Sequence, residues 1–213
     1  MPKLTFWYEF ASTYSYLAAM RVEDVARNSG VDVIWQPFLL GPILRSQGMP
    51  TSPFNLYPVK GEYMWRDMAR GAQKLGLPPI TCPNPFPQNG LLAARIALIG
   101  MEDGWGPTFT RAVYSAEFAE GRQIDDKEML GKLITAQGAD ASGVLDRAAT
   151  DEGVKSSLRS ATELAAELGL FGAPSFTTTD SELFWGNDRL EDALNWAKSE
   201  SSRSAAARVV AHP

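Results

Sequence analysis

Four consecutive residues, Ser12-Thr13-Tyr14-Ser15, bring four hydroxyl groups together near the N-terminus. They precede an apolar helical segment, so they mark a helix start, where backbone N–H groups lack intrahelical partners. A serine hydroxyl at such a position can donate a hydrogen bond to an anion such as a thiolate, which the positive end of the helix also stabilises. Ser12 is therefore a candidate catalytic residue. The alternative is that it only caps the helix.

Other reactive side chains are scarce. The 213 residues include one cysteine, Cys82, and one histidine, His212. A single chain then has no CxxC redox pair and no Cys/His zinc site, and we expect no metal. Cys82 stands among prolines and is interpreted as an incidental thiol, and His212 lies in a Ser/Ala/Arg-rich tail. If the protein uses a thiolate, another molecule must therefore supply the thiol.

The composition is that of an ordinary globular protein, with 45% hydrophobic and 21% charged residues. The net charge is −5 and both signs are interspersed, which argues against nucleic acid as a partner. No apolar run is long enough to span a membrane, and no glycine-rich nucleotide-binding motif occurs. The N-terminus carries an acid and several aromatic residues and resembles a strand rather than a signal peptide, so we expect a cytoplasmic protein with no membrane partner.

The elements that must position Ser12 follow from the hydrophobic pattern. Residues 4–10 favour a strand, residues 14–27 a helix that ends at Gly30, and residues 31–38 a second strand. This order predicts a β-α-β unit with parallel strands and a right-handed crossover. Ser12 then lies between the first strand and the helix that follows it.

The rest of the chain changes period twice. Residues 60–168 repeat apolar positions at helical spacing. Strand patterns return at residues 175–179 and 182–185, joined by a turn at Asp180-Ser181, and a last helix follows. The order predicts an α/β protein with a thioredoxin-like fold and a large helical insertion. The expected domains are a discontinuous thioredoxin-like domain (1–59 and 169–198), a helical insertion domain (60–168) and a flexible tail (199–213).

A second candidate segment is Phe171-Gly172-Ala173-Pro174-Ser175-Phe176, directly before the third predicted strand. A cis Pro174 would expose the backbone N–H and C=O of Ala173 to a peptide-like ligand, as an added strand would use them. A trans proline in a loop is the alternative that base rates favour.

Four ordered motifs resemble the 2-hydroxychromene-2-carboxylate isomerase family, which is related to the kappa-class glutathione transferases in the DsbA-like branch of the thioredoxin superfamily. Residues 8–18 read Tyr-Glu-Phe-Ala-Ser-Thr-Tyr-Ser-Tyr-Leu-Ala and are similar to the family's Phe-Asp-Phe-x-Ser-Pro-Tyr-Ser-Tyr-Leu-Ala. The segments 58–64, 171–176 and 184–190 resemble its further motifs, in the same order. The resemblance covers residues 4–198.

The resemblance implies a glutathione site. Ser12 would face the glutathione sulfur, and Ala173, before a cis Pro174, would pair its backbone with the cysteinyl unit. Asn187 and Asp188 would hold the γ-glutamyl group, and Lys60 would reach a glutathione carboxylate. The alternatives are a solvated lysine at position 60 and a helix-capping role for Asp188.

The sequence departs from the family pattern at two positions. Thr13 replaces a proline, and Met49 stands where many relatives carry a ligand-contacting asparagine, for which Asn55 is the expected substitute. Candidates for the pocket of the second substrate are Tyr63, Trp65, Phe86, Asn89 and Arg95.

The function that the resemblance implies is glutathione-dependent isomerisation of an aromatic carboxylate, of the 2-hydroxychromene-2-carboxylate to benzylidenepyruvate type, in aromatic catabolism. The implied mechanism is reversible conjugate addition of a thiolate, and relatives imply a homodimer. One alternative is a kappa-like glutathione transferase or peroxidase. The other is a non-catalytic thioredoxin-like protein that binds thiols or peptides.

Overall fold

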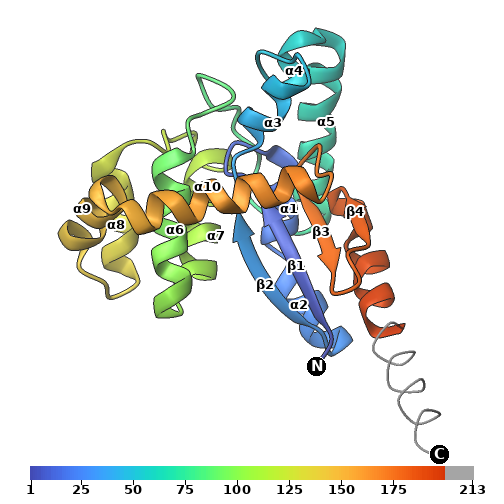
Figure 1. Cartoon of the computed structure of the whole chain (residues 1–213). Helices are drawn as coiled ribbons and strands as arrows, with labels where there is room; N and C mark the ends of the chain where they lie inside the picture. The colour runs from blue at the N-terminus through green and yellow to red at the C-terminus, as the bar shows by residue number, and fades with distance from the viewer. Residues whose placement is uncertain (200–213) are drawn as a thin grey trace, which may run out of the picture.

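The first strand is buried on both of its faces, which places it inside a sheet. The computed structural model describes residues 1–199, and in it β1 (Lys3–Tyr8) lies between two neighbouring strands (Figure 1). β1 pairs in parallel with β2 (Asp32–Pro37), Phe6 opposite Trp35, and antiparallel with β3 (Ser175–Thr178), Phe6 opposite Phe176. β3 pairs antiparallel with β4 (Leu183–Trp185) at the edge, so the strand order is β2-β1-β3-β4.

The β-α-β unit contains two helices rather than the single one predicted for residues 14–27. α1 (Thr13–Ala19) and α2 (Val22–Ser29) are separated by Met20 and Arg21. The Arg21 side chain contacts Asn187 and Glu191, which lie far away in the sequence. The helix is therefore interrupted at the residue that makes this long-range contact, and the helical periodicity of the sequence does not show the interruption. Gly30 ends α2 in the left-handed conformation, with φ of 69°, as its position predicted.

Two short helices that the periodicity did not predict follow β2. They are α3 (Leu40–Ser46) and α4 (Pro53–Leu56), and α4 leads into α5 (Pro58–Lys74). Both helices are too short to repeat an apolar stripe, so hydrophobic periodicity does not predict them.

The remaining helices pack on one another and on α1. α1 packs against α5 and α7, and α10 leads from α8 and α9 back to β3, as Figure 1 shows. The helices after α5 are α6 (Leu91–Asp103), α7 (Gly106–Phe118), α8 (Lys127–Ala136), α9 (Ala141–Thr150) and α10 (Glu152–Glu167).

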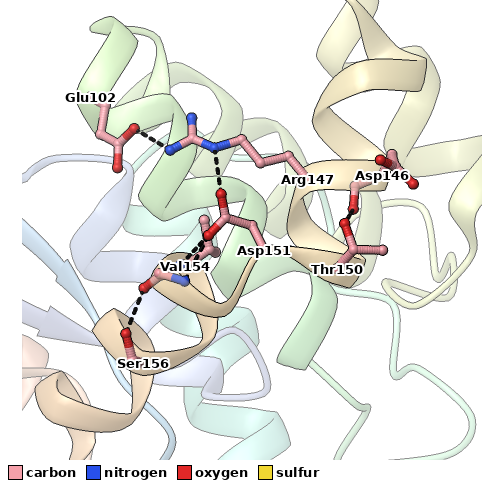
Figure 2. Close-up of polar contacts among 8 residues, drawn as sticks. Glu102, Asp146, Arg147, Thr150, Asp151, Val154 and Ser156 are labelled. Atoms are coloured by element: carbon pink, nitrogen blue, oxygen red, sulfur yellow. Dashed lines mark hydrogen bonds and ion pairs between the residues drawn. The ribbon is translucent and has the colours of Figure 1, made fainter.

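The junction of α9 and α10 is fixed by an aspartate cap (Figure 2). Asp151 ends α9 and caps α10, where its Oδ1 accepts from the N–H groups of Gly153 and Val154 at 2.7 and 3.1 Å. Arg147 of α9 contacts Asp151 at 3.6 Å and reaches Glu102 of α6 at 2.7 Å. One acid therefore orients α10, the helix that returns the chain to the sheet.

The C-terminal part begins with the predicted turn, where Ser181 has a φ of 65°, and continues through β4 to η1 (Asn187–Arg189) and a helix over 190–199. None of the helices within residues 1–199 is long and apolar enough to cross a membrane. Residues 200–213, for which the sequence predicts a tail that contains His212, lie outside the described residues.

Candidate functional site

A cavity of about 1170 Å³ opens where the β1–α1 turn, the α3–α5 region, the segment before α6 and the segments 171–174 and 185–189 meet. Nine of the twelve residues predicted from the sequence line it: Ser12, Lys60, Tyr63, Phe86, Asn89, Ala173, Pro174, Asn187 and Asp188. The structure thus brings together residues that lie up to 176 positions apart in the chain.

Ser12 makes two hydrogen bonds in the wall of this cavity. Its Oγ accepts from the Ser15 N–H at 3.2 Å, which caps α1. The same hydroxyl donates to the Ala173 carbonyl oxygen at 2.8 Å. The capping alternative is therefore realised, and the proton of the hydroxyl is directed across the site. Because α1 has only seven residues, the local hydroxyl and first-turn N–H groups matter more here than a macrodipole.

Ala173 and Pro174 are joined by a cis peptide bond. The Pro174 carbonyl accepts from Gly186 N–H at 3.0 Å, which fixes the segment against the start of η1. Within residues 1–199 the Ala173 N–H has no acceptor, and the Ala173 carbonyl accepts only from the Ser12 hydroxyl. Both backbone groups thus remain able to pair with a ligand, since a carbonyl oxygen accepts two hydrogen bonds.

Asn187 is held by Arg21, a residue that the sequence did not single out. The Arg21 Nε donates to Asn187 Oδ1 at 3.1 Å, a second guanidinium nitrogen donates to the Asn187 backbone oxygen, and the same guanidinium pairs with Glu191. Because Asn187 uses its amide oxygen toward Arg21, its NH₂ group is left to donate toward the cavity. Asp188 is exposed beside it, 3.7 Å from Arg189.

Lys60 and Asn55, two further predicted ligand contacts, differ in position. Lys60 is exposed, with its Nζ 5.8 Å from the centre of the Phe54 ring. Asn55, the expected substitute for a missing asparagine, does not line the cavity. Its Nδ2 donates to the Phe86 carbonyl at 2.9 Å, so it holds the segment that carries Phe86 in place.

Three further residues that the sequence analysis discussed, Trp65, Arg95 and Cys82, do not line the cavity. Trp65 stands behind the wall and packs edge-on against Phe86, with ring centres 5.0 Å apart. Arg95 does not line the cavity, and its guanidinium reaches the Ala148 carbonyl at 3.5 Å. Cys82 is exposed outside the cavity, and partial burial raises its thiol pKa, which disfavours the reactive thiolate.

Glu9 lines the cavity and was missed, because the sequence placed it at the end of a strand. Its Oε1 accepts from the Ala11 N–H at 3.3 Å. Burial raises the pKa of Glu9 to about 7, an effect that this hydrogen bond opposes. Its position just before the hydroxyl run was the available signal, since a perturbed acid in a cleft is a functional candidate.

Further aromatic rings line the cavity beside the predicted ones. Phe171 and Trp185 pack with ring centres 4.8 Å apart and are about half exposed, and Phe54 lies near Tyr14. Tyr14 donates to Asp67 Oδ2 at 3.0 Å, and burial followed by this bond raises its pKa. The cavity therefore offers aromatic surface together with cations.

Comparisons with known proteins identify the family and the fold. Residues 3–195 match the family described as the DSBA-like thioredoxin domain. A solved structure of a 2-hydroxychromene-2-carboxylate isomerase superposes with a TM-score of 0.81 at 25% identity, covering 96% of this chain and 98% of that one. The thioredoxin-like fold with its helical insertion, which the sequence predicts, is confirmed.

Relatives from two enzyme classes are similar along nearly their whole length. A 2-hydroxychromene-2-carboxylate isomerase of Sphingobium xenophagum is 29% identical over 189 residues, 88% of this chain and 94% of the relative. Glutathione s-transferase kappa 2 of Caenorhabditis elegans is 26% identical over 211 residues, 90% of this chain and 89% of the relative. Both classes are those that the sequence motifs indicated.

Proposed function

Because the chain belongs to the DSBA-like thioredoxin domain family, we propose that it is a glutathione-dependent enzyme that isomerises an aromatic carboxylate. The observation that carries the proposal is the contact between Ser12 Oγ and the Ala173 carbonyl, 2.8 Å apart in the wall of the large cavity. This hydrogen bond places the Ser12 hydroxyl, which we expect to face the thiolate, next to the Ala173 backbone, which we expect to pair with the peptide part of glutathione. The names of the similar isomerases support the reaction class.

The residues present fit glutathione group by group. The tripeptide offers a peptide backbone, an α-ammonium with its carboxylate, a second carboxylate and a thiol. The wall offers the N–H and C=O of Ala173, the amide of Asn187 with the carboxylate of Asp188, and the Lys60 ammonium. Each group meets a partner of complementary charge or hydrogen-bonding type, and the Ser12 hydroxyl remains for the sulfur.

When bound, glutathione supplies a thiolate that can add reversibly to a double bond conjugated to a ketone. The protein's part is to lower the pKa of the thiol, and a hydrogen bond to an anion is roughly twice as strong as one to a neutral group. Ser12 therefore gains more from donating to a thiolate than from donating to the Ala173 carbonyl. A downward shift of two pKa units corresponds to about 2.7 kcal/mol.

The second substrate has room beside this site. The aromatic side chains of Phe54, Tyr63, Phe86, Phe171 and Trp185 line the same cavity. Arg45, Lys60 and Lys74 also line it, and a cation there would pair with a substrate carboxylate. Aromatic walls with a few cations suit a flat aromatic anion better than a long peptide.

The stoichiometry of glutathione tests the proposal. We expect 2-hydroxychromene-2-carboxylate and its open benzylidenepyruvate form to interconvert only when glutathione is present. Thiol titration should show that glutathione is not consumed, since an isomerase returns it after each turnover. The conversion is followed by absorbance, with Ser12→Ala as the impaired variant and Cys82→Ser as the active control.

Other outcomes point elsewhere. Thiol loss that matches product formation would assign the protein to the transferases, which the kappa relative makes the second candidate. Glutathione binding without turnover of any electrophile would indicate a non-catalytic thiol binder. Full conversion without glutathione would contradict the proposal.

A further inference from the structure

Glu9 lies in the same turn as Ser12. Its backbone carbonyl accepts from the Ser12 N–H at 3.0 Å, and its Oε1 accepts from the Ala11 N–H at 3.3 Å. The first bond fixes the turn and the second orients the carboxyl, and both Glu9 and Ser12 line the cavity. The acid and the hydroxyl therefore face the same space.

The opposite side of the carboxyl is closed by protein. A Cβ built on Gly90 would lie only 3.2 Å from Glu9 Oε1, so the carboxyl packs directly against this backbone. Within residues 1–199 the Glu9 carboxyl forms no ion pair. Tyr114 and Glu117 of α7 interact electrostatically with Glu9. The other polar groups that line the same cavity are Ser12, Thr13, Tyr14, Arg45, Thr51, Ser52, Lys60, Tyr63, Asp67, Arg70, Lys74, Gln88, Asn89, Asn187, Asp188 and Arg189.

Of the two acids, Glu9 is the one that changes charge near neutrality. Burial raises its pKa to about 7. Glu117 is fully buried, neither of its oxygens has a hydrogen-bond partner among residues 1–199, and burial followed by the Glu9 charge raises its pKa well above its usual range. Burial therefore favours the neutral form of Glu117, whereas Glu9, with a pKa of about 7, is partly ionised at neutral pH.

We propose that the Glu9 carboxylate accepts the proton of the glutathione thiol that binds beside Ser12, an inference that rests on the proposed function. The S–H bond breaks, its electron pair stays on the sulfur, and the proton forms an O–H bond with a Glu9 oxygen. No electron leaves either molecule, and the proton returns to the sulfur when glutathione dissociates.

The energetics favour this arrangement for two reasons. Proton transfer is efficient when the donor and acceptor have similar pKa values, and a thiol near about 8.5 that Ser12 lowers comes close to that of Glu9. Two adjacent anions are also disfavoured, so a neutral Glu9 leaves the single negative charge on the sulfur. By accepting the thiol proton, the Glu9 carboxylate becomes a neutral carboxylic acid beside the thiolate.

Counting protons on binding tests the inference without any turnover. Titration calorimetry in buffers of different ionisation enthalpy, at about pH 7.5, measures the protons released when glutathione binds. With Glu9 as acceptor, the wild type should release only about 0.2 protons, because a carboxyl of pKa about 7 is about three-quarters ionised and takes up most of the thiol proton. Glu9→Gln keeps an acceptor for the Ala11 N–H and should release about 0.9 protons.

Two matched controls sharpen the comparison. S-methylglutathione has no thiol proton and should release about none in either protein. Glu117→Gln changes the neighbouring acid and should behave like the wild type. If Glu117→Gln instead releases about 0.9 protons while Glu9→Gln still releases about 0.2, the proton acceptor is Glu117 and the proposal is overturned.

A second measurement does not depend on the variant. Carboxyl ¹³C resonances of labelled glutamate should show Glu9 moving to its protonated position when glutathione binds, and staying in place with S-methylglutathione. Equal proton release by wild type and Glu9→Gln, with thiolate absorbance present in both, would refute the role of Glu9 and leave the proposed function standing. Absence of glutathione binding or of thiolate in the wild type would instead contradict the proposed function itself.

Discussion

At the scale of single residues, Ser12 uses its hydroxyl in two directions. The oxygen accepts from the Ser15 N–H at 3.2 Å, and the proton is donated to the Ala173 carbonyl at 2.8 Å. Capping needs a lone pair, whereas stabilising an anion needs the proton, so the two roles do not compete. Their effects on stability and on thiol ionisation are therefore separable by experiment.

Ser12→Ala should raise the pKa of bound glutathione by about one unit or more, since it removes a charge-assisted hydrogen bond. It should also destabilise the fold by about 1 kcal/mol through loss of the cap. Thiolate absorbance against pH measures the first effect, and thermal unfolding measures the second.

The control for Ser12→Ala is Ser12→Thr, which keeps a hydroxyl at the same position and should keep most of the thiolate. A titration curve of bound glutathione that does not move in Ser12→Ala would remove Ser12 from thiol activation.

Arg21 acts on the ligand through Asn187, which makes it a positioning residue. Arg21→Met keeps an apolar stem but frees the Asn187 amide oxygen, so the amide is no longer fixed. We expect glutathione to bind about tenfold more weakly, which corresponds to about 1.4 kcal/mol. Cysteinylglycine lacks the γ-glutamyl group, so its affinity should change little. Calorimetry measures both affinities.

Arg27→Met is the matched control, because the Arg27–Asp24 pair is about three-quarters exposed and lies elsewhere on α2. Equal weakening of glutathione and cysteinylglycine by Arg21→Met would indicate a general structural role instead.

At the scale of elements, the sequence predicted what local chemistry determines. A first strand was predicted over residues 4–10 from its aromatic residues and is observed at Lys3–Tyr8, and the end of α2 was predicted from Gly30. The break between α1 and α2 was not predicted, because Arg21 is drawn to Asn187 by a contact 166 residues away. Arg21 was missed as a site residue for the same reason. Glu9 had a local signal in its position just before the hydroxyl run, but its burial depends on segments that are distant in the sequence.

The cap at the α9–α10 junction gives a prediction at this scale. Asp151→Ala leaves the N–H groups of Gly153 and Val154 without their side-chain acceptor and should lower Tm by about 2–4 °C. Asp151→Asn keeps a good capping oxygen and should stay near the wild type, although its pair with the half-exposed Arg147 is lost. Equal Tm losses in the two variants would show that the ion pair, not the cap, holds the junction.

At the scale of the whole molecule, the cavity is assembled from five separate segments of the chain. Spacing alone would not have united Ser12, Lys60 and Asp188, and only the resemblance to a family placed them in one site. The resemblance includes an acid at position 9 but does not predict its raised pKa, which burial against Gly90 and the neighbouring protein causes. The burial of such acids also makes the stability of the fold depend on pH.

Glu117 should make the protein less stable as the pH rises. Its pKa in the folded chain lies well above 4.5, its usual value, because of burial first and the Glu9 charge second. Above pH 4.5 the unfolded chain loses this proton while the folded chain keeps it, so the free energy of unfolding falls with pH, by up to about 1.4 kcal/mol per unit. The effect is absent below pH 4.5 and ends at the folded pKa.

Glu117→Gln replaces this acid by a group that does not ionise, so the Tm of the variant relative to the wild type should increase steadily between pH 5 and pH 8. The buried amide has a packing and desolvation cost of its own, but that cost does not depend on pH, so the slope and not the offset is the measured quantity. Glu9 retains a smaller dependence of the same sign up to about pH 7 in both proteins. Glu120→Gln, which makes the same change of net charge at an exposed position two residues after α7, is the control and should run parallel to the wild type. If the Tm curves of Glu117→Gln and wild type are parallel over this range, Glu117 does not hold its proton in the folded protein.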